Sequence, residues 1–425
     1  MDNRITRRPI SKMITLRIQL AASVFCAIVF LFIDSTQSGS QLVLLENRTS
    51  VLNRTGRQFV WLPFFWGVGL VRFENGECDA GNGFTGTCYT RRECNYLDGV
   101  RASLCANKAG ACCVFQRTCG DSSDLNNTYF VSPGFPTTYT GGTACSFTIV
   151  KQDDACQVGG VSPVECRSLV ENSLFQVRLD FLTLNLAQPN INGTCTTDAL
   201  TVTGGASVAP VLCGENSGQH MYMDFNGNQS ITITIYVRSS SASRSWNIKV
   251  AQINCNCPWR APSGCLQFYN QLSGTVRSFN YGSSSVLNGT RQLAGMNYGV
   301  CVNMFPGYCS IEWSATSDLY GFSLTGNTFT AVGDGTLGTT AASLTGVNCT
   351  TDFVVIPAPI LTSNSSYLNT DRFCGNGFPS VISYSKPFVL TVVTNGNEVN
   401  DTGNRGFSLS FTQELCSGAL ILGKR

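Results

Sequence analysis

Short runs in which apolar and polar residues alternate recur along the chain. Examples are FQVRLDF (175–181), SITITIYV (230–237) and GFSLSF (406–411), while FVLTVV (388–393) is a nearly continuous apolar run of similar length. A period of two residues is typical of a half-buried β-strand, because successive side chains point to opposite faces of a sheet. The pattern therefore predicts a chain built of β-strands.

Two stretches of the chain follow the same plan. CTTDALTV begins at Cys195 and CTTDFVVI begins at Cys349, and each is followed by a Cys-Gly pair, at Cys213 and at Cys374. From the cysteine of each pair, 42 residues lead to a closing cysteine, in AQINC and in TQELC. Strand-like runs precede both closing cysteines. These matching intervals predict a duplicated module of the size of one domain.

The first 38 residues have the pattern of a secretory signal peptide. A basic stretch precedes an uncharged run of 14 residues (20–33), which is short of the roughly 20 residues that a spanning helix needs. Small residues follow, so we expect cleavage near Ser38. The alternative is an uncleaved anchor that extends back to Ile14, but it places Arg17 inside the membrane. A second apolar stretch (59–71) is interrupted by proline and glycine and is not expected to span a membrane.

Cysteine usage agrees with an extracellular location. The chain has 21 cysteines, and Cys26 lies in the signal-like segment, so 20 remain, an even number suited to disulfides. Metal binding by cysteine is the alternative, but there are no paired C-x-x-C knuckles and only one histidine. Nine N-x-S/T sequons are spread over the mature chain, and Asn348 is the most doubtful because its middle residue is Cys349. We expect glycans at the other eight: Asn47, Asn53, Asn126, Asn192, Asn228, Asn288, Asn364 and Asn400.

Charge and motif content argue against several classes of function. The chain has 28 basic and 26 acidic residues, and the balance is 23 to 24 without the first 38 residues. With no Lys/Arg cluster, we expect no nucleic-acid partner. A Ser-His-Asp system needs a histidine, and the single candidate, His220, lies in the strand-like GQHMYMDF, where a structural role is favoured. No HExxH, G-x-S-x-G or P-loop motif occurs, so we expect no enzyme, no catalytic residue and no cofactor.

A compact cysteine-rich segment precedes the duplicated part. Six cysteines within 36 residues would staple a segment too small to bury much surface, and sequence alone allows fifteen pairings. The order of cysteines, which ends in CCVF, resembles a shortened clip-like module of the kind found before secreted serine proteases. That resemblance implies the pairs Cys78–Cys112, Cys88–Cys105 and Cys94–Cys113.

The duplicated part resembles a known family. A cysteine at 119, a Ser-Pro-Gly-Phe-Pro turn (132–136), a cysteine that opens a strand at 145, an alternating strand, C-x-x-D and Cys-Gly together look like a CUB domain. The resemblance implies a β-sandwich with local disulfides, Cys119–Cys145 and Cys195–Cys213. Each such bridge contributes roughly 3 kcal/mol in the chain-entropy model.

The second copy has the same plan with more divergence. GCLQFYNQLSGTVRSFNY, from Gly264, matches a CUB opening. The resemblance implies Cys265–Cys301 and Cys349–Cys374, with Cys309 as a rival of Cys301. As a whole, residues 73 to 416 are similar to secreted CUB proteins of arthropods. Five cysteines are extra to the family's minimal set: Cys156 and Cys166, which could close a loop of their own, and Cys255, Cys257 and Cys416, which have no assigned partner.

These observations predict an all-β fold with two tandem CUB-like β-sandwich domains of the jelly-roll type after a small disulfide-rich module. The expected layout is a signal peptide (1–38), a linker or propeptide-like segment (39–73), the cysteine-rich clip-like module (74–116), CUB-like domain 1 (117–256), CUB-like domain 2 (257–418) and a tail (419–425).

The expected function is recognition of an extracellular protein or glycan by a secreted, glycosylated, non-catalytic protein. Loops at the ends of such sandwiches contact partners, while the strands form the scaffold. The clip-like segment suggests a second reading, a non-catalytic regulatory partner of an extracellular protease cascade. A third reading is a passive matrix component. No membrane span is expected in the mature chain.

Calcium is the one ion that the resemblance raises, because many CUB domains hold it between loops and use it to capture a basic side chain of a partner. The family's C-x-x-D aspartate corresponds to Asp198 and Asp352. Near Asp198 the later loop reads RSSSASRSW, which has arginines and no acid, so we expect no calcium in the first module. In the second module, Asn395, Glu398 and Asp401 could supply oxygens. Here we expect weak binding at most, with Asp352, Glu398 and Asp401 as the candidate ligands.

Overall fold

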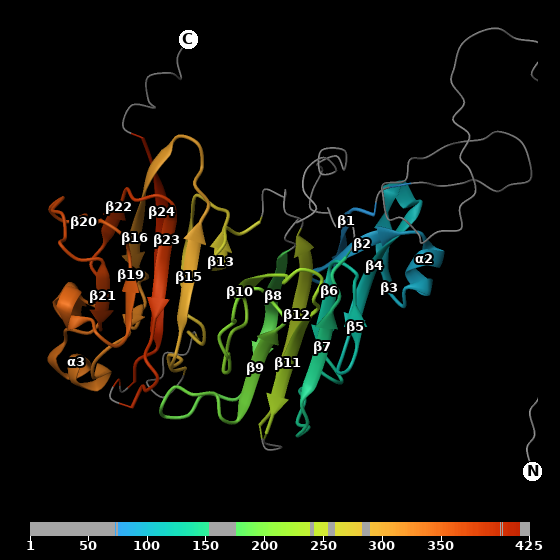
Figure 1. Cartoon of the computed structure of the whole chain (residues 1–425), viewed down its shortest axis with the longest axis horizontal. Helices are drawn as coiled ribbons and strands as arrows, with labels where there is room; N and C mark the ends of the chain where they lie inside the picture. The colour runs from blue at the N-terminus through green and yellow to red at the C-terminus, as the bar shows by residue number, and fades with distance from the viewer. Residues whose placement is uncertain are drawn as a thin grey trace, which may run out of the picture. The chain divides into compact units, whose positions relative to one another are not determined.

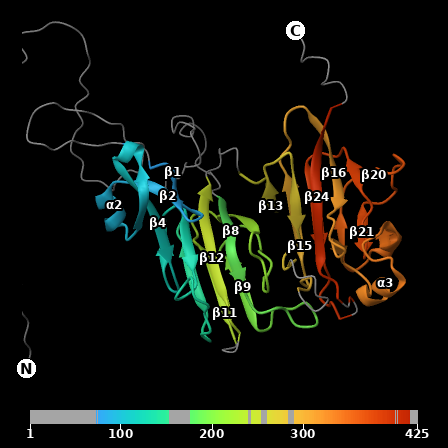
Figure 2. The same cartoon turned by 180° about the vertical axis from the view of Figure 1, so that it is seen from behind.

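The computed structural model describes residues 73, 75–152, 176–238, 242–253, 260–282, 290–399, 401 and 403–416. Most of the regular structure in these residues is β-strand, as Figures 1 and 2 show. The all-β fold predicted from the alternating runs is therefore confirmed. The signal-like segment lies outside the described residues, and among the residues described no helix has the length and apolar character needed to cross a bilayer.

The cysteine-rich module is a small sheet with one short helix. Six cysteines form three disulfides within it. The helix begins in a capping box, in which Thr90 Oγ1 accepts the Glu93 N–H and the Glu93 carboxylate accepts the Thr90 N–H. The elements are β1 (Glu77–Gly81), β2 (Phe84–Tyr89), α2 (Arg91–Tyr96), β3 (Val100–Cys105), the 3₁₀ turn η1 (Ala106–Lys108) and β4 (Gly110–Arg117).

The first sandwich is made of two facing sheets. One has the strand order β6-β12-β8-β10 and the other β5-β7-β11-β9. Two of the alternating runs form β8 and β11, and inward-facing side chains of the sandwich, including Trp246 and Phe181, are fully buried. The strands are β5 (Ser122–Ser123), β6 (Thr128–Val131), β7 (Cys145–Ile149), β8 (Gln176–Asn185), β9 (Asp198–Thr203), β10 (His220–Asp224), β11 (Ile231–Val237) and β12 (Ser245–Ile253).

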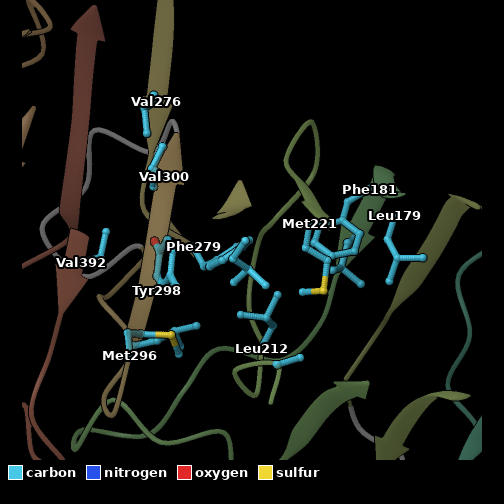
Figure 3. Packing of buried hydrophobic residues seen from close by; sticks show 14 of the residues in the cluster. Leu179, Phe181, Leu212, Met221, Val276, Phe279, Met296, Tyr298, Val300 and Val392 are labelled. Carbon is cyan, nitrogen blue, oxygen red and sulfur yellow. The ribbon is translucent and has the colours of Figure 1, made fainter. Parts of the chain in front are cut away.

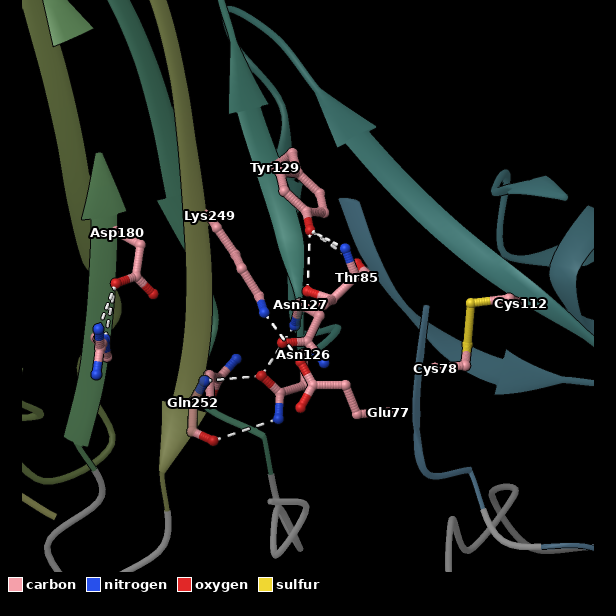
Figure 4. A network of polar contacts seen from close by, with 11 residues as sticks. Glu77, Cys78, Thr85, Cys112, Asn126, Asn127, Tyr129, Asp180, Lys249 and Gln252 are labelled. Carbon is pink, nitrogen blue, oxygen red and sulfur yellow. Dashed lines mark hydrogen bonds and ion pairs between the residues drawn. A yellow bond between two sulfur atoms is a disulfide. The ribbon is translucent and has the colours of Figure 1, made fainter. Parts of the chain in front are cut away.

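The cysteine-rich module shares a sheet with this sandwich. Residues 115–117 of β4 pair in parallel with residues 128–130 of β6, so the sheet continues from β1 to β10. The boundary expected between residues 116 and 117 therefore falls inside β4. Side chains hold the same junction (Figure 4): Tyr129 Oη accepts the Thr85 N–H at 2.8 Å, and Lys249 Nζ lies 3.0 Å from Glu77 Oε1.

The second sandwich also has two sheets, β13-β15-β23-β19-β21-β18 and β14-β24-β16-β22-β20, with β17 paired to β24. Trp313 and Phe411 pack between the sheets, with their ring centroids 5.8 Å apart. The first-sheet strands are β13 (Cys265–Tyr269), β15 (Asn297–Val302), β18 (Ser343–Thr345), β19 (Phe353–Val355), β21 (Arg372–Gly375) and β23 (Phe388–Val393). The other elements are β14 (Ser273–Arg277), β16 (Tyr308–Ala315), β17 (Phe322–Ser323), β20 (Pro359–Leu361), β22 (Val381–Ser383), β24 (Gly406–Leu415), α3 (Thr328–Asp334) and the 3₁₀ turns η3 (Thr340–Ala342) and η4 (Gly346–Asn348).

Buried polar side chains connect the two sandwiches. Asn216 Oδ1 accepts the Asn280 N–H at 2.8 Å, and Gln219 Nε2 donates to Ser278 O at 2.9 Å. Apolar side chains of both sandwiches belong to one contiguous cluster (Figure 3), which includes Leu212 and Phe279. Because each of these polar groups has a partner, its burial need not destabilise the contact.

Candidate metal centre

Three acidic side chains of the second sandwich come together at one end of its sheets. Asp352 is the last residue before β19, and it follows Cys349, which the disulfide to Cys374 fixes. Glu398 and Asp401 lie in the long loop between β23 and β24. The strand β19 pairs with β23, so the start of the first and the end of the second lie at the same edge. This pairing brings the carboxylates close despite their distance in sequence.

The three carboxylates are close and buried. One oxygen of each lies within 4.8 Å of the others. Asp352 and Glu398 have no exposed surface, and Asp401 is 7% exposed. Charged carboxylates are rarely buried this deeply without a partner of opposite charge, because leaving water costs several kcal/mol for each ion.

Each carboxylate accepts a hydrogen bond at one of its oxygens, and two of the other oxygens have no hydrogen-bond partner. Asp352 Oδ1 accepts the Asn395 N–H at 2.7 Å, and Asp401 Oδ1 accepts the Gly326 N–H at 2.8 Å. Glu398 Oε2 accepts a bond from Gln292 Nε2. Asp352 Oδ2 and Glu398 Oε1 are buried and have no hydrogen-bond partner. A cation can satisfy such oxygens where a neutral donor is missing.

The pKa values reflect this crowding. Burial raises the pKa of Asp352 to about 7, and the negative charge of Asp401 adds to the rise. Burial, followed by the charge of Asp352, raises the pKa of Glu398 to about 9. The ionised forms are thus disfavoured by low polarity and mutual repulsion, two effects that a bound cation would reverse. An all-oxygen set of carboxylates suits a hard cation such as Ca²⁺.

The corresponding aspartate of the first sandwich has a different partner. Asp198 accepts two hydrogen bonds from Arg244, at 2.7 Å from Nε and 2.8 Å from Nη2, and both side chains are fully buried. The Ala187 N–H also donates to Asp198 Oδ2. The guanidinium therefore takes the place beside this carboxylate that a cation would need. The arginine comes from the RSSSASRSW loop in which the sequence shows no acid.

Residues 262–414 match the family model of the animal CUB domain. The match covers the second sandwich, including all three carboxylates, and we refer to this segment as the CUB domain. No curated protein sequence matches the chain.

Several solved structures are also similar to the chain. The CUB1-EGF-CUB2 domain of human MASP-1/3 is 14% identical, with 68% of this chain and 100% of that chain covered and a TM-score of 0.23. The MASP-1 CUB2 domain bound to Ca²⁺ is 20% identical, with 31% and 98% covered and a TM-score of 0.23. The full extracellular region of zebrafish Gpr126/Adgrg6 is 13% identical, with 73% and 38% covered and a TM-score of 0.22. These scores do not establish a shared arrangement of domains.

The CUB domain contains a second buried charge that sequence reasoning missed. Arg405 is 1% exposed, and its guanidinium carbon lies 4.9 Å from the ring centroid of Tyr281 and 5.3 Å from that of Tyr320. Arg405 Nη1 is 3.6 Å from Asp318 Oδ2, which also accepts the Tyr281 hydroxyl at 2.6 Å. The RGF sequence at Arg405 gives no sign of these partners. We interpret the group as a structural cation between two aromatic rings.

His220 is a structural residue at the junction of the sandwiches. It lies in β10, and its Nε2 accepts the Phe268 N–H of β13 at 3.1 Å. Tyr222 and Tyr269 pack edge-on against the imidazole, with ring centroids 5.6 and 5.0 Å away. Burial, followed by the positive charge of Arg178, lowers the pKa of His220 to about 4.

The disulfides include the seven pairs that the family resemblances imply. An eighth disulfide, Cys309–Cys416, joins two cysteines whose pairing the sequence left open. Cys265 pairs with Cys301 and not with its rival Cys309. Both lie near the ends of the neighbouring strands β16 and β24. Cys156, Cys166, Cys255 and Cys257 lie outside the described residues. The seven pairs are Cys78–Cys112, Cys88–Cys105, Cys94–Cys113, Cys119–Cys145, Cys195–Cys213, Cys265–Cys301 and Cys349–Cys374.

The sequons differ in exposure. Asn192, Asn228 and Asn364 are exposed, as is Asn348. Asn126 is buried, and its Nδ2, the atom to which a glycan would be attached, donates to Gln252 O at 3.3 Å (Figure 4). The structure therefore does not support a glycan at Asn126. The sequons outside the described residues are Asn47, Asn53, Asn288 and Asn400.

Proposed function

We propose that this protein is a secreted, non-catalytic extracellular binding protein whose CUB domain holds a calcium ion between Asp352, Glu398 and Asp401. The observation that carries the proposal is the trio of buried carboxylates with two unpartnered oxygens. A calcium ion would supply positive charge that all three oxygens can share. The match to the animal CUB model and the eight disulfides among the described residues support an extracellular recognition role.

The chain's own residues hold the proposed ligands in position. The Asn395 N–H fixes Asp352, and the Gly326 N–H fixes Asp401 from a different loop. Gln292 orients Glu398 by a hydrogen bond to the oxygen opposite the unpartnered one. These donors leave one oxygen of Asp352 and one of Glu398 available and restrict their motion, which lowers the entropic cost of binding an ion.

Isothermal titration calorimetry on the mature secreted protein tests the calcium site. We expect saturable Ca²⁺ binding to the wild type, and its loss in Asp401→Asn, in which Asn Oδ1 can still accept the Gly326 N–H while the charge is removed. The matched control is Asp334→Asn, which removes an exposed charge at the end of α3. Absence of binding to a folded wild type, or equal binding to both variants, would contradict the proposal.

Partner capture tests the recognition role. The immobilised mature protein would be exposed to extracellular fluid with Ca²⁺ or with a chelator, and specifically bound material identified. Recovery of matrix proteins or glycans supports the proposed role. Recovery of proteases supports instead a regulatory partner of a protease cascade.

A further inference from the structure

A loop of the first sandwich lies against Glu398 of the CUB domain. Residues 190–194 lie in the connection between β8 and β9, and within this loop Gly193 has a left-handed backbone with φ of +74°. A Cβ atom on Gly193 would overlap Glu398 Cγ and would lie 2.9 Å from Ala294 N. Glycine is the residue that allows both this conformation and this close approach.

Hydrogen bonds join the loop to Glu398 and to two other residues of the CUB domain. The Glu398 N–H donates to Asn192 O at 3.3 Å, and the Ala294 N–H donates to Gly193 O at 3.0 Å. The Arg291 guanidinium donates to Ile191 O. Glu398, one of the proposed ligands, thus contacts the first sandwich through its backbone and through its side-chain stem.

The loop has a defined conformation of its own. Asn190 Oδ1 accepts the N–H groups of Asn192 and Thr194, at 3.0 and 2.9 Å, and the Gly193 N–H donates to Asn190 O at 3.0 Å. Cys195, which follows, is fixed by its disulfide to Cys213. Docking of this loop therefore requires little additional ordering, which favours a stable contact.

We propose that calcium at Asp352, Glu398 and Asp401 clasps the loop 190–194 onto the CUB domain, so that the ion couples the two sandwiches of one chain. This proposal rests on the calcium site proposed above. A cation that neutralises the cluster stabilises the Glu398 segment in the position that donates to Asn192 O. Coupling between two such sites is reciprocal: the docked loop must raise calcium affinity by the same factor by which calcium favours docking.

Hydrogen–deuterium exchange on the full mature protein, with Ca²⁺ or with a chelator, measures the clasp directly. We expect the amides of residues 190–194 to exchange about tenfold more slowly with Ca²⁺, within the usual range of coupling between two sites. The Asp401→Asn variant should lose this protection. If calorimetry detects Ca²⁺ binding but the exchange rates of the loop amides do not change, the proposed coupling is wrong and the calcium site is supported. Absence of Ca²⁺ binding would overturn the site itself.

The Gly193→Ala variant tests the coupling by changing the loop instead of a proposed calcium ligand. The added methyl group would displace the loop from Glu398, so the calcium dissociation constant should rise about tenfold. The control is Gly227→Ala, which has a similar left-handed backbone, with φ of +59°, but open space around the new methyl group. Its calcium affinity should equal that of the wild type. Equal affinity in both variants, each shown to be folded by thermal unfolding, would rule out the clasp.

Discussion

The two C-T-T-D aspartates show how one residue type acquires opposite surroundings. Asp198 is buried against Arg244, whereas Asp352 is buried against Glu398 and Asp401. A paired carboxylate can remain ionised in the interior, but a cluster of like charges cannot do so without a cation. The neighbours brought by the loop before the last strand therefore decide whether the aspartate pairs with an arginine or groups with other carboxylates.

His220 leads to a prediction of pH dependence. Its pKa is about 4 in the folded protein against 6.5 for the ordinary side chain, because burial favours the neutral form. Between these two pKa values, the unfolded chain binds a proton at this side chain that the folded chain does not bind. The stability that neutral His220 contributes is therefore fully present above pH 6.5 and is lost as the pH falls toward 4. The loss from this group is at most about 3 kcal/mol.

Denaturant unfolding of the wild type and of His220→Gln at pH 7, 5.5 and 4.5 checks the effect. Glutamine can accept the Phe268 N–H but does not titrate, so its free energy of unfolding should decline less steeply over this range. Parallel pH profiles for the two proteins would show that His220 does not cause the dependence.

At the scale of elements, the disulfide Cys309–Cys416 ties the end of the last strand, β24, to β16. It closes a loop with a sequence separation of 107 residues, the longest among the described disulfides. A constraint of this length removes much conformational freedom from the unfolded chain. The hydrogen bonds of β24 with β16 and β14 also hold this strand in the sheet.

We expect replacement of both Cys309 and Cys416 by serine to lower the free energy of unfolding by about 2–4 kcal/mol. Denaturant titration under non-reducing conditions measures this loss. Replacement of Cys78 and Cys112 in the cysteine-rich module is the comparison, because their sequence separation of 34 closes a shorter loop, for which the chain-entropy model predicts a smaller loss. No shift in the double serine variant would mean that strand pairing alone holds β24.

At the scale of the whole molecule, the sandwiches meet through buried, partnered polar groups in addition to apolar ones. Gln219 donates to Ser278 O and accepts from Gln267 Nε2 at 3.1 Å, and both glutamines are buried. Removal of one such partner leaves the others buried and unsatisfied, which costs about 1–3 kcal/mol for each group. The contact is therefore expected to make the two sandwiches unfold together.

Gln219→Ala should separate the unfolding of the two sandwiches into two calorimetric transitions. Gln413→Ala is the matched control, because Gln413 is also buried and donates to Gln271 O and Asn303 O within the CUB domain. That variant should lower stability without dividing the transition. A single transition in Gln219→Ala would indicate that apolar contacts suffice for the coupling.

The amino-acid sequence by itself determined the strands and the local disulfides. Alternation with a period of two is a property of neighbouring residues, so a short stretch of sequence is enough to recognise a strand. The disulfides Cys195–Cys213 and Cys349–Cys374 each join cysteines of one sequence motif, so the motif itself indicates them. The same motif placed Asp198 and Asp352 and drew attention to Glu398 and Asp401.

Tertiary structure alone decided which charges meet. The pairing of β19 with β23 carries Asp352 to Glu398 and Asp401, and the loop before β12 folds Arg244 back onto Asp198. The docking of Gly193 on Glu398 joins residues of different sandwiches. Burial and distance between groups far apart in sequence depend on strand register and loop conformation, and electrostatic energies change steeply with both. No local pattern of residues encodes those quantities.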